Sequence, residues 1–146
     1  MNSDDSVRRL HCLLQPNHPG GAVLFVGAGM SAAFNDVVFS SNQSNAYGGA
    51  VSVWTGGTYV FTDVSFIDNE STNNIAGAIQ VTGSTDLTLI DCSFDNNRAF
   101  SGGKHISVAG SSTIKICGST SFANPDLNDP AAIVFFGTAS QVPCTV

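Results

Sequence analysis

The chain has 146 residues, the length of a single domain, with five Lys and Arg against eleven Asp and Glu and a formal net charge of −6. This balance excludes a basic surface for phosphates, so we expect no nucleic-acid partner. No stretch has the 18 or more apolar residues of a membrane span, and we expect no transmembrane segment in this chain.

Residues 1–19 carry no repeat and are predicted to form an irregular N-terminal lead-in or cap. The apolar run at 10–14 is interrupted by His11 and is too short for the core of a signal peptide. No signal peptide is therefore visible in this chain. Either the chain is not exported by that route, or it is a fragment of a larger protein, which we favour because the repeat is already present at Gly20.

A glycine-rich motif starts at Gly20 and returns in every later part of the chain, in its clearest form as Gly48-Gly49-Ala50-Val51. Its first apolar positions are spaced by 28, 28, 27 and 27 residues, at Val23, Val51, Ile79, Ile106 and Ile133. A second motif, FxxN, keeps nearly the same period, with its phenylalanines at Phe39, Phe66, Phe94 and, in a shortened copy, Phe122. A fixed period of this length indicates a solenoid.

The second unit shows how one repeat is built. Three short strands are predicted at 50–54, 58–62 and 64–66, joined by turns at glycines and at Asp63. One unit cannot bury its apolar face alone, so each strand should pair in parallel with its equivalent in the next unit. Residues 20–146 are thus predicted to form an all-β, right-handed, single-stranded parallel β-helix of about five coils. A β-sandwich is the rival fold, but it would not require identical turns in every unit.

The repeat positions predict three stacks inside the solenoid. Branched and aromatic side chains should stack at the first apolar position, at the position two residues later (Phe25, Val53, Val81, Val108, Phe135) and at the FxxN phenylalanines. The asparagines should hydrogen-bond along the axis as a structural ladder of Asn42, Asn69, Asn97 and Asn124.

The pairing of GGA[IV] with FxxN over about residues 20–124 resembles the repeat of the chlamydial polymorphic outer membrane proteins and their right-handed β-helix relatives. The resemblance implies a surface-exposed module with a structural or adhesive role and no catalysis. It also implies an extracellular or cell-surface location within a larger protein. The expected partner is a protein or glycan on another surface, or neighbouring domains or subunits at the ends of the helix.

The alternative function is a polysaccharide-acting β-helix enzyme or a carbohydrate-binding module. Asp36, Asp63 and Asp91 each lie three residues before a repeat phenylalanine, and Ser119 takes this slot in the fourth coil. Stacked carboxylates suit Ca²⁺ or an acidic catalytic cluster. The simpler interpretation is that each aspartate bonds the backbone of its own turn, which every coil needs. No other cofactor is expected.

The repeat breaks where Lys104 and His105 replace Gly and Ala, and Arg98 lies six residues earlier. These three residues form a candidate ligand or partner patch, with drift in an outer coil as the plainer explanation. A lyase would use Lys104 as its base only if Asp91 or Asp95 faced the same groove.

Cys117 and Cys144 each follow a first apolar position by 11 residues, which places them on adjacent rungs in one column. Stacked rungs lie within disulfide range, so either a disulfide or two buried thiols is expected. Trp54 and Ser52 are expected on the outward face. One exposed aromatic could touch a sugar, although such a side chain more often packs on a loop.

Overall fold

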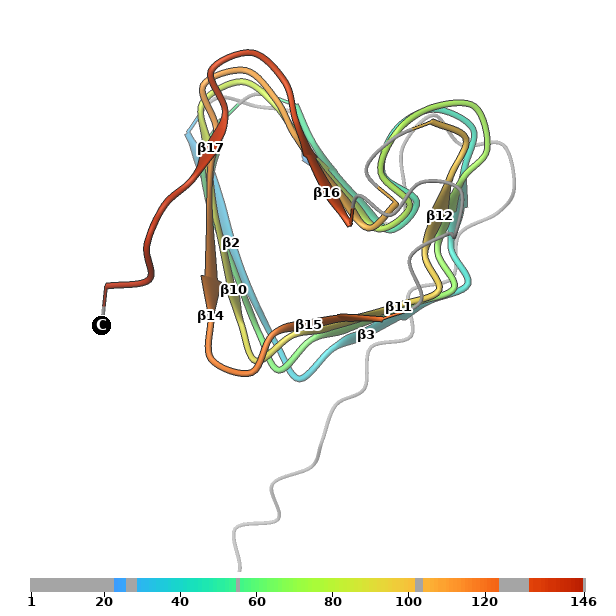
Figure 1. Cartoon of the computed structure of the whole chain (residues 1–146), viewed down its shortest axis with the longest axis horizontal. Coiled ribbons are helices and arrows are strands. Elements are labelled where there is room, and N and C mark those ends of the chain that lie inside the picture. The colour runs from blue at the N-terminus through green and yellow to red at the C-terminus, as the bar shows by residue number, and fades with distance from the viewer. Residues whose placement is uncertain (1–22, 26–28, 55, 102–103, 124–131, 146) are drawn as a thin grey trace, which may run out of the picture.

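The computed structural model describes residues 23–25, 29–54, 56–101, 104–123 and 132–145, and this part of the chain is all-β with no helix. Its strands stack along one axis into a parallel β-solenoid whose successive coils overlay one another (Figure 1). The predicted lead-in at 1–19 and the last predicted ladder residue, Asn124, lie outside the described residues.

Four sheets run along the solenoid. The first contains β1 (Val23–Phe25), β5 (Val51–Val53), β9 (Ile79–Val81), β13 (Ile106–Val108) and β16 (Ile133–Phe135). The second contains β2 (Met30–Asn35), β6 (Gly57–Thr62), β10 (Thr85–Ile90), β14 (Thr113–Cys117) and β17 (Ser140–Gln141). The third contains β3 (Val38–Ser40), β7 (Ser65–Ile67), β11 (Ser93–Asp95) and β15 (Ser121–Ala123). The fourth contains β4 (Gln43–Ser44), β8 (Glu70–Ser71) and β12 (Arg98–Ala99).

The strand register follows the predicted repeat. Val51 pairs with Ile79, Ile79 with Ile106, and Ile106 with Ile133, so the first sheet spans about four turns between its end strands. All described strand pairs are parallel, which confirms the parallel solenoid and rules out the β-sandwich. The fourth sheet was not predicted, because strands of two residues are too short to show an alternating pattern.

The core lies inside the coils, where the predicted stacks meet. Phe39, Phe66 and Phe94 are buried, and their rings stack with centroid distances of 5.1 and 4.7 Å. The stack continues from Phe94 to Phe122 at 4.9 Å. The predicted inward position of Phe135 is only partly correct: it pairs with Val108, but 38% of it is exposed because β16 is the last strand of its sheet.

Candidate functional site

The three predicted aspartates occupy one turn of successive coils. Asp36, Asp63 and Asp91 have φ angles of 55°, 53° and 52°, in the left-handed region that Asp tolerates better than most residues. The backbone N–H of each donates to a carbonyl of the next coil, as from Asp36 to Thr62 at 3.0 Å. The aspartate at this position therefore forms the turn between the strands of the second and third sheets.

Gly118, rather than Ser119, takes this slot in the fourth coil. Ile90 pairs with Cys117, so Gly118 follows in register with Asp91 and has the same left-handed conformation, with φ at 61°. The turn holds one extra residue, and the N–H and hydroxyl of Ser119 donate to the Asp91 carboxylate at 2.7 and 3.1 Å. The insertion explains why counting back from Phe122 chose the wrong residue.

The described residues contain no group of three or more His, Cys, Asp or Glu side chains that could hold a metal ion. Asp36, Asp63 and Asp91 thus line one corner without converging on a common point. All three stand at a turn with left-handed φ angles, and the Asp91 carboxylate accepts from Ser119 of the next coil rather than from its own turn.

Asparagine side chains form a bonded stack inside the solenoid. Asn42 donates its side-chain amide to Oδ1 of Asn69 at 2.8 Å, and Asn69 donates in the same way to Asn97 at 2.8 Å. Each is at most 1% exposed. Asn69 and Asn97 also donate to the carbonyls of Phe39 and Phe66, which links the asparagine stack to the phenylalanine strands.

The predicted basic patch does not form an open surface. Lys104 is 6% exposed and His105 is fully buried, whereas Arg98 is exposed. The Lys104 amine donates to the carbonyl of Ala99 at 2.8 Å, inside the corner between the fourth and first sheets. The sequence could not show this burial, because it depends on how the corner folds over the lysine stem.

His105 stands in the column that holds Ala50 and Ala78 in earlier coils, and its ring reaches the core. The ring lies 5.9 Å from both Phe94 and Phe122, and Nδ1 lies 3.1 Å from the side-chain nitrogen of Asn97. Burial lowers the pKa of His105, and the Ala123 carbonyl and Asp95 carboxylate offset part of this shift. The residue therefore extends the polar stack as a neutral ring.

We expect His105 to make the solenoid less stable in mild acid. Its pKa is lower in the folded state than the usual ~6.5, so the unfolded chain binds the proton more tightly. The contribution of neutral His105 to the free energy of unfolding is complete above about pH 6.5. It is lost as the pH falls towards the folded-state pKa, and the free energy of unfolding then decreases by no more than about 1.4 kcal/mol per pH unit. In urea unfolding at pH 7.5, 6.5 and 5.5, the free energy of unfolding should decrease less with falling pH for His105→Gln than for the parent chain. Equal slopes for both proteins would contradict this assignment.

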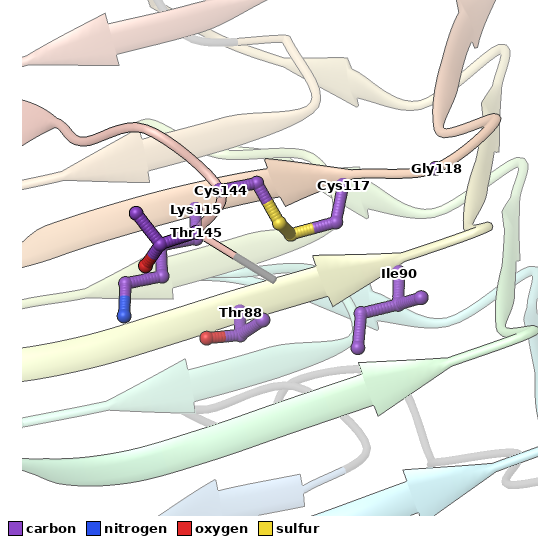
Figure 2. Close-up of a pocket in the computed structure, with 7 residues that line it drawn as sticks. All are labelled: Thr88, Ile90, Lys115, Cys117, Gly118, Cys144 and Thr145. Atoms are coloured by element: carbon purple, nitrogen blue, oxygen red, sulfur yellow. A yellow bond between two sulfur atoms is a disulfide. The ribbon is translucent and has the colours of Figure 1, made fainter.

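Cys117 and Cys144 form a disulfide with a Cα–Cα distance of 5.6 Å, which ties the C-terminal segment to β14 (Figure 2). On the chain-entropy model, closing a loop of this length stabilises the fold by roughly 3.5 kcal/mol. Cys92 is a free, buried thiol, and burial raises its pKa.

A pocket of about 460 Å³ lies beside this disulfide (Figure 2). Its walls come from the outer face of the second sheet and from the C-terminal segment, at Thr88, Ile90, Lys115, Cys117, Gly118, Cys144 and Thr145. A ligand here would meet the Lys115 ammonium group, the disulfide, Ile90 and two threonine side chains.

A second pocket, of about 340 Å³, is lined by Tyr47, Trp54, Gln80 and Thr82. Trp54 is 38% exposed, as expected for an outward side chain, and its ring lies 5.8 Å from that of Tyr47 at an interplanar angle of 88°. Ser52 also points away from the core, but it is fully buried, because the loop that carries Tyr47 covers it. The outward position of Ser52 was predicted, and its burial beneath this loop was not.

Sequence reasoning missed Tyr47, Gln80 and Thr82 as lining residues. One signal was present: Gln80 is the only amide in the polar column of the first sheet, between Ser52 and Ser107. Tyr47 directly precedes the Gly48-Gly49 corner, but nothing in the repeat indicates that its ring would reach Trp54, the residue that follows β5.

No helix among the described residues is long and apolar enough to cross a membrane.

The fold is a parallel β-solenoid built from a repeat with two motifs per coil. Residues 36–53 match the model of the Chlamydia polymorphic membrane protein repeat, a segment that runs from the Asp36 turn through β5. This match and the parallel solenoid together fit a β-helix repeat of the polymorphic membrane protein type. No curated protein and no solved structure gives a significant match to the chain.

Proposed function

We propose that this chain is a non-enzymatic repeat module of a surface protein, which holds an adhesive face in rigid register outside the cell. The repeat match over residues 36–53 carries this proposal, because the matched family is one of surface membrane proteins. The same register continues in coils beyond the match, from Ile79 through Ile133. Solenoids of this kind present extended surfaces to their partners.

The interior supports a scaffolding role. Stacked phenylalanines and an asparagine ladder join successive coils, so the surface they carry is held at a fixed spacing. The Cys117–Cys144 disulfide suits an oxidising compartment outside the cytoplasm. The partners would be a protein or glycan on an opposing surface, or neighbouring domains at the ends of the solenoid.

Two positions favour this function over a polysaccharide-acting enzyme. The Lys104 amine, the candidate base, donates to Ala99 in the corner between the fourth and first sheets. The Asp91 carboxylate lies at a different corner, between the second and third sheets, and accepts from Ser119. Lys104 and Asp91, one of the two carboxylates considered for such a lyase, therefore belong to separate corners of the coil.

Surface display and adhesion can be tested with the purified chain. Antibodies raised against it should label intact cells of the source organism as strongly as permeabilised cells. Beads coated with the folded chain should bind host or neighbouring cells several-fold more than beads coated with reduced, heat-unfolded chain. Labelling that requires permeabilisation would exclude surface display, and equal binding of the two bead preparations would exclude a folded adhesive face.

A further inference from the structure

The pocket between Tyr47 and Trp54 contains a buried acceptor without a donor. Gln80 is 5% exposed, and its Oε1 has no hydrogen-bond partner within the described part of the chain. A buried acceptor left unpaired is costly, so native proteins usually provide it with a donor. Because Gln80 lines a pocket, that donor can come from water in the free protein and from a ligand in the bound one.

The aromatic rings that line the pocket favour a ligand with a flat apolar face. The rings of Tyr47 and Trp54 meet nearly at a right angle, and Trp54 keeps 38% of its surface exposed. This corner offers a flat apolar face beside the Gln80 amide and the Thr82 side chain. A sugar ring has the matching character, with C–H groups on its face and hydroxyl donors at its edge. Apolar walls with a few placed polar groups are typical of small-molecule sites.

The pocket is also held in place before any ligand arrives. The Tyr47 carbonyl accepts hydrogen bonds from the hydroxyls of Ser52 at 2.7 Å and Ser44 at 3.1 Å. On the other side, the N–H of Thr82 donates to the Val53 carbonyl at 2.9 Å. These bonds fix the backbone on both sides of the pocket, which lowers the ordering cost of binding.

The lack of charged side chains among the described lining residues favours a neutral ligand. Tyr47, Trp54, Gln80 and Thr82 carry no charge at neutral pH, and the chain as a whole has a net charge of −6. Nucleic-acid bases also stack on aromatic rings, but their phosphates need basic side chains, and none of the described residues that line this pocket is basic. An aliphatic peptide side chain would fill the corner and leave Gln80 unpaired.

We propose that Tyr47, Trp54, Gln80 and Thr82 form a binding subsite for a neutral saccharide, with its ring against the aromatic corner and a hydroxyl donating to Gln80 Oε1. This inference rests on the proposed function and deepens it, since it names the chemistry of the surface partner. Its test uses the purified chain alone, so it does not depend on display or on cells.

Trp54 is the only tryptophan in the chain, so intrinsic fluorescence reports directly on this pocket. The full chain is titrated with neutral hexasaccharides built from glucose, mannose or N-acetylglucosamine, and with a heparin hexasaccharide as the acidic comparison. At least one neutral sugar should change the emission of Trp54 saturably. Absence of saturation with every neutral sugar, or saturation with heparin alone, would overturn the proposal.

Variants of the lining residues, each with a matched control, then test whether the sugar binds in this pocket. Gln80→Leu and Tyr47→Ala should weaken the neutral sugar by about tenfold or more, as expected for an orphaned hydrogen bond or a lost stacking partner. Tyr47→Phe keeps the ring, and Gln141→Leu changes an exposed amide on β17, so both should stay within about threefold of the parent.

Circular dichroism establishes that each variant is folded. If Gln80→Leu does not fold, the Tyr47→Ala and Tyr47→Phe pair decides the question, and equal affinity of these two would reject the subsite. Loss of sugar binding with surface labelling and bead adhesion intact would remove this inference alone. Loss of surface labelling with sugar binding intact would remove the proposed function instead.

Discussion

Replacing Asn69 with leucine should lower the free energy of unfolding by about 3–5 kcal/mol, because several buried groups lose their partners together. Oδ1 of Asn69 accepts from the backbone and side-chain nitrogens of Asn42, at 3.1 and 2.8 Å. Its amide donates to Oδ1 of Asn97 and to the Phe39 carbonyl, at 2.8 and 3.0 Å. Leucine has a similar size, but its side chain makes none of these four hydrogen bonds, and only the backbone N–H of residue 69 would still donate to Asn97 Oδ1.

Urea unfolding followed by circular dichroism measures this loss. The matched control is Asn73→Leu in the same coil, where the side chain is exposed and the change should stay within about 0.5 kcal/mol. If the two variants lose the same stability, the asparagine ladder does not hold the coils together.

Gly77→Ala should destabilise the solenoid by about 3 kcal/mol or more, since the added methyl group would meet backbone rather than movable side chains. A Cβ at Gly77 would lie 2.4 Å from the carbonyl oxygen of Lys104 and 2.5 Å from the amide nitrogen of Arg98. The corner at Gly77 packs too closely against the backbone of the next coil for any side chain. Relief would require the neighbouring coil to move away, which breaks the bond from Gly77 N–H to the Lys104 carbonyl.

Gly29→Ala is the control for the glycine effect itself. Gly29 has φ at +73°, but the space that a Cβ would occupy there is open, so only the left-handed backbone penalty of about 1 kcal/mol is expected. Thermal unfolding of both variants separates steric crowding from backbone preference. A smaller effect at Gly77 than at Gly29 would mean that the corner adapts to the methyl group.

The period of the repeat was sufficient to predict the solenoid and most of its register. The first apolar position predicted the pairing of Val51 with Ile79 and of Ile106 with Ile133. The prediction succeeded because each coil has the same strands and turns, so equivalent residues stack above one another along the axis. The prediction failed at Ser119, where one inserted residue shifts the turn and places Gly118 at the corner.

The candidate site was less predictable. Trp54 was recognised as outward-facing, but its partners Tyr47 and Gln80 come from a loop in the same coil and from a strand in the next. No spacing in the sequence relates these three side chains to one another. The burial of Lys104 was equally invisible, because a lysine stem can lie along a corner or extend into solvent.

The amino-acid sequence by itself determined the repeat, the parallel stacking and the residues that face the core, because alternation and period dictate which side chains meet along the axis. Only the tertiary structure decided what happens between the sheets of one coil. There Ser52 and Lys104 become buried, Tyr47 comes to Trp54, and an acceptor of Gln80 is left without a protein donor among the described residues. Those contacts depend on loop paths that vary from coil to coil, and a periodic pattern carries no information about them.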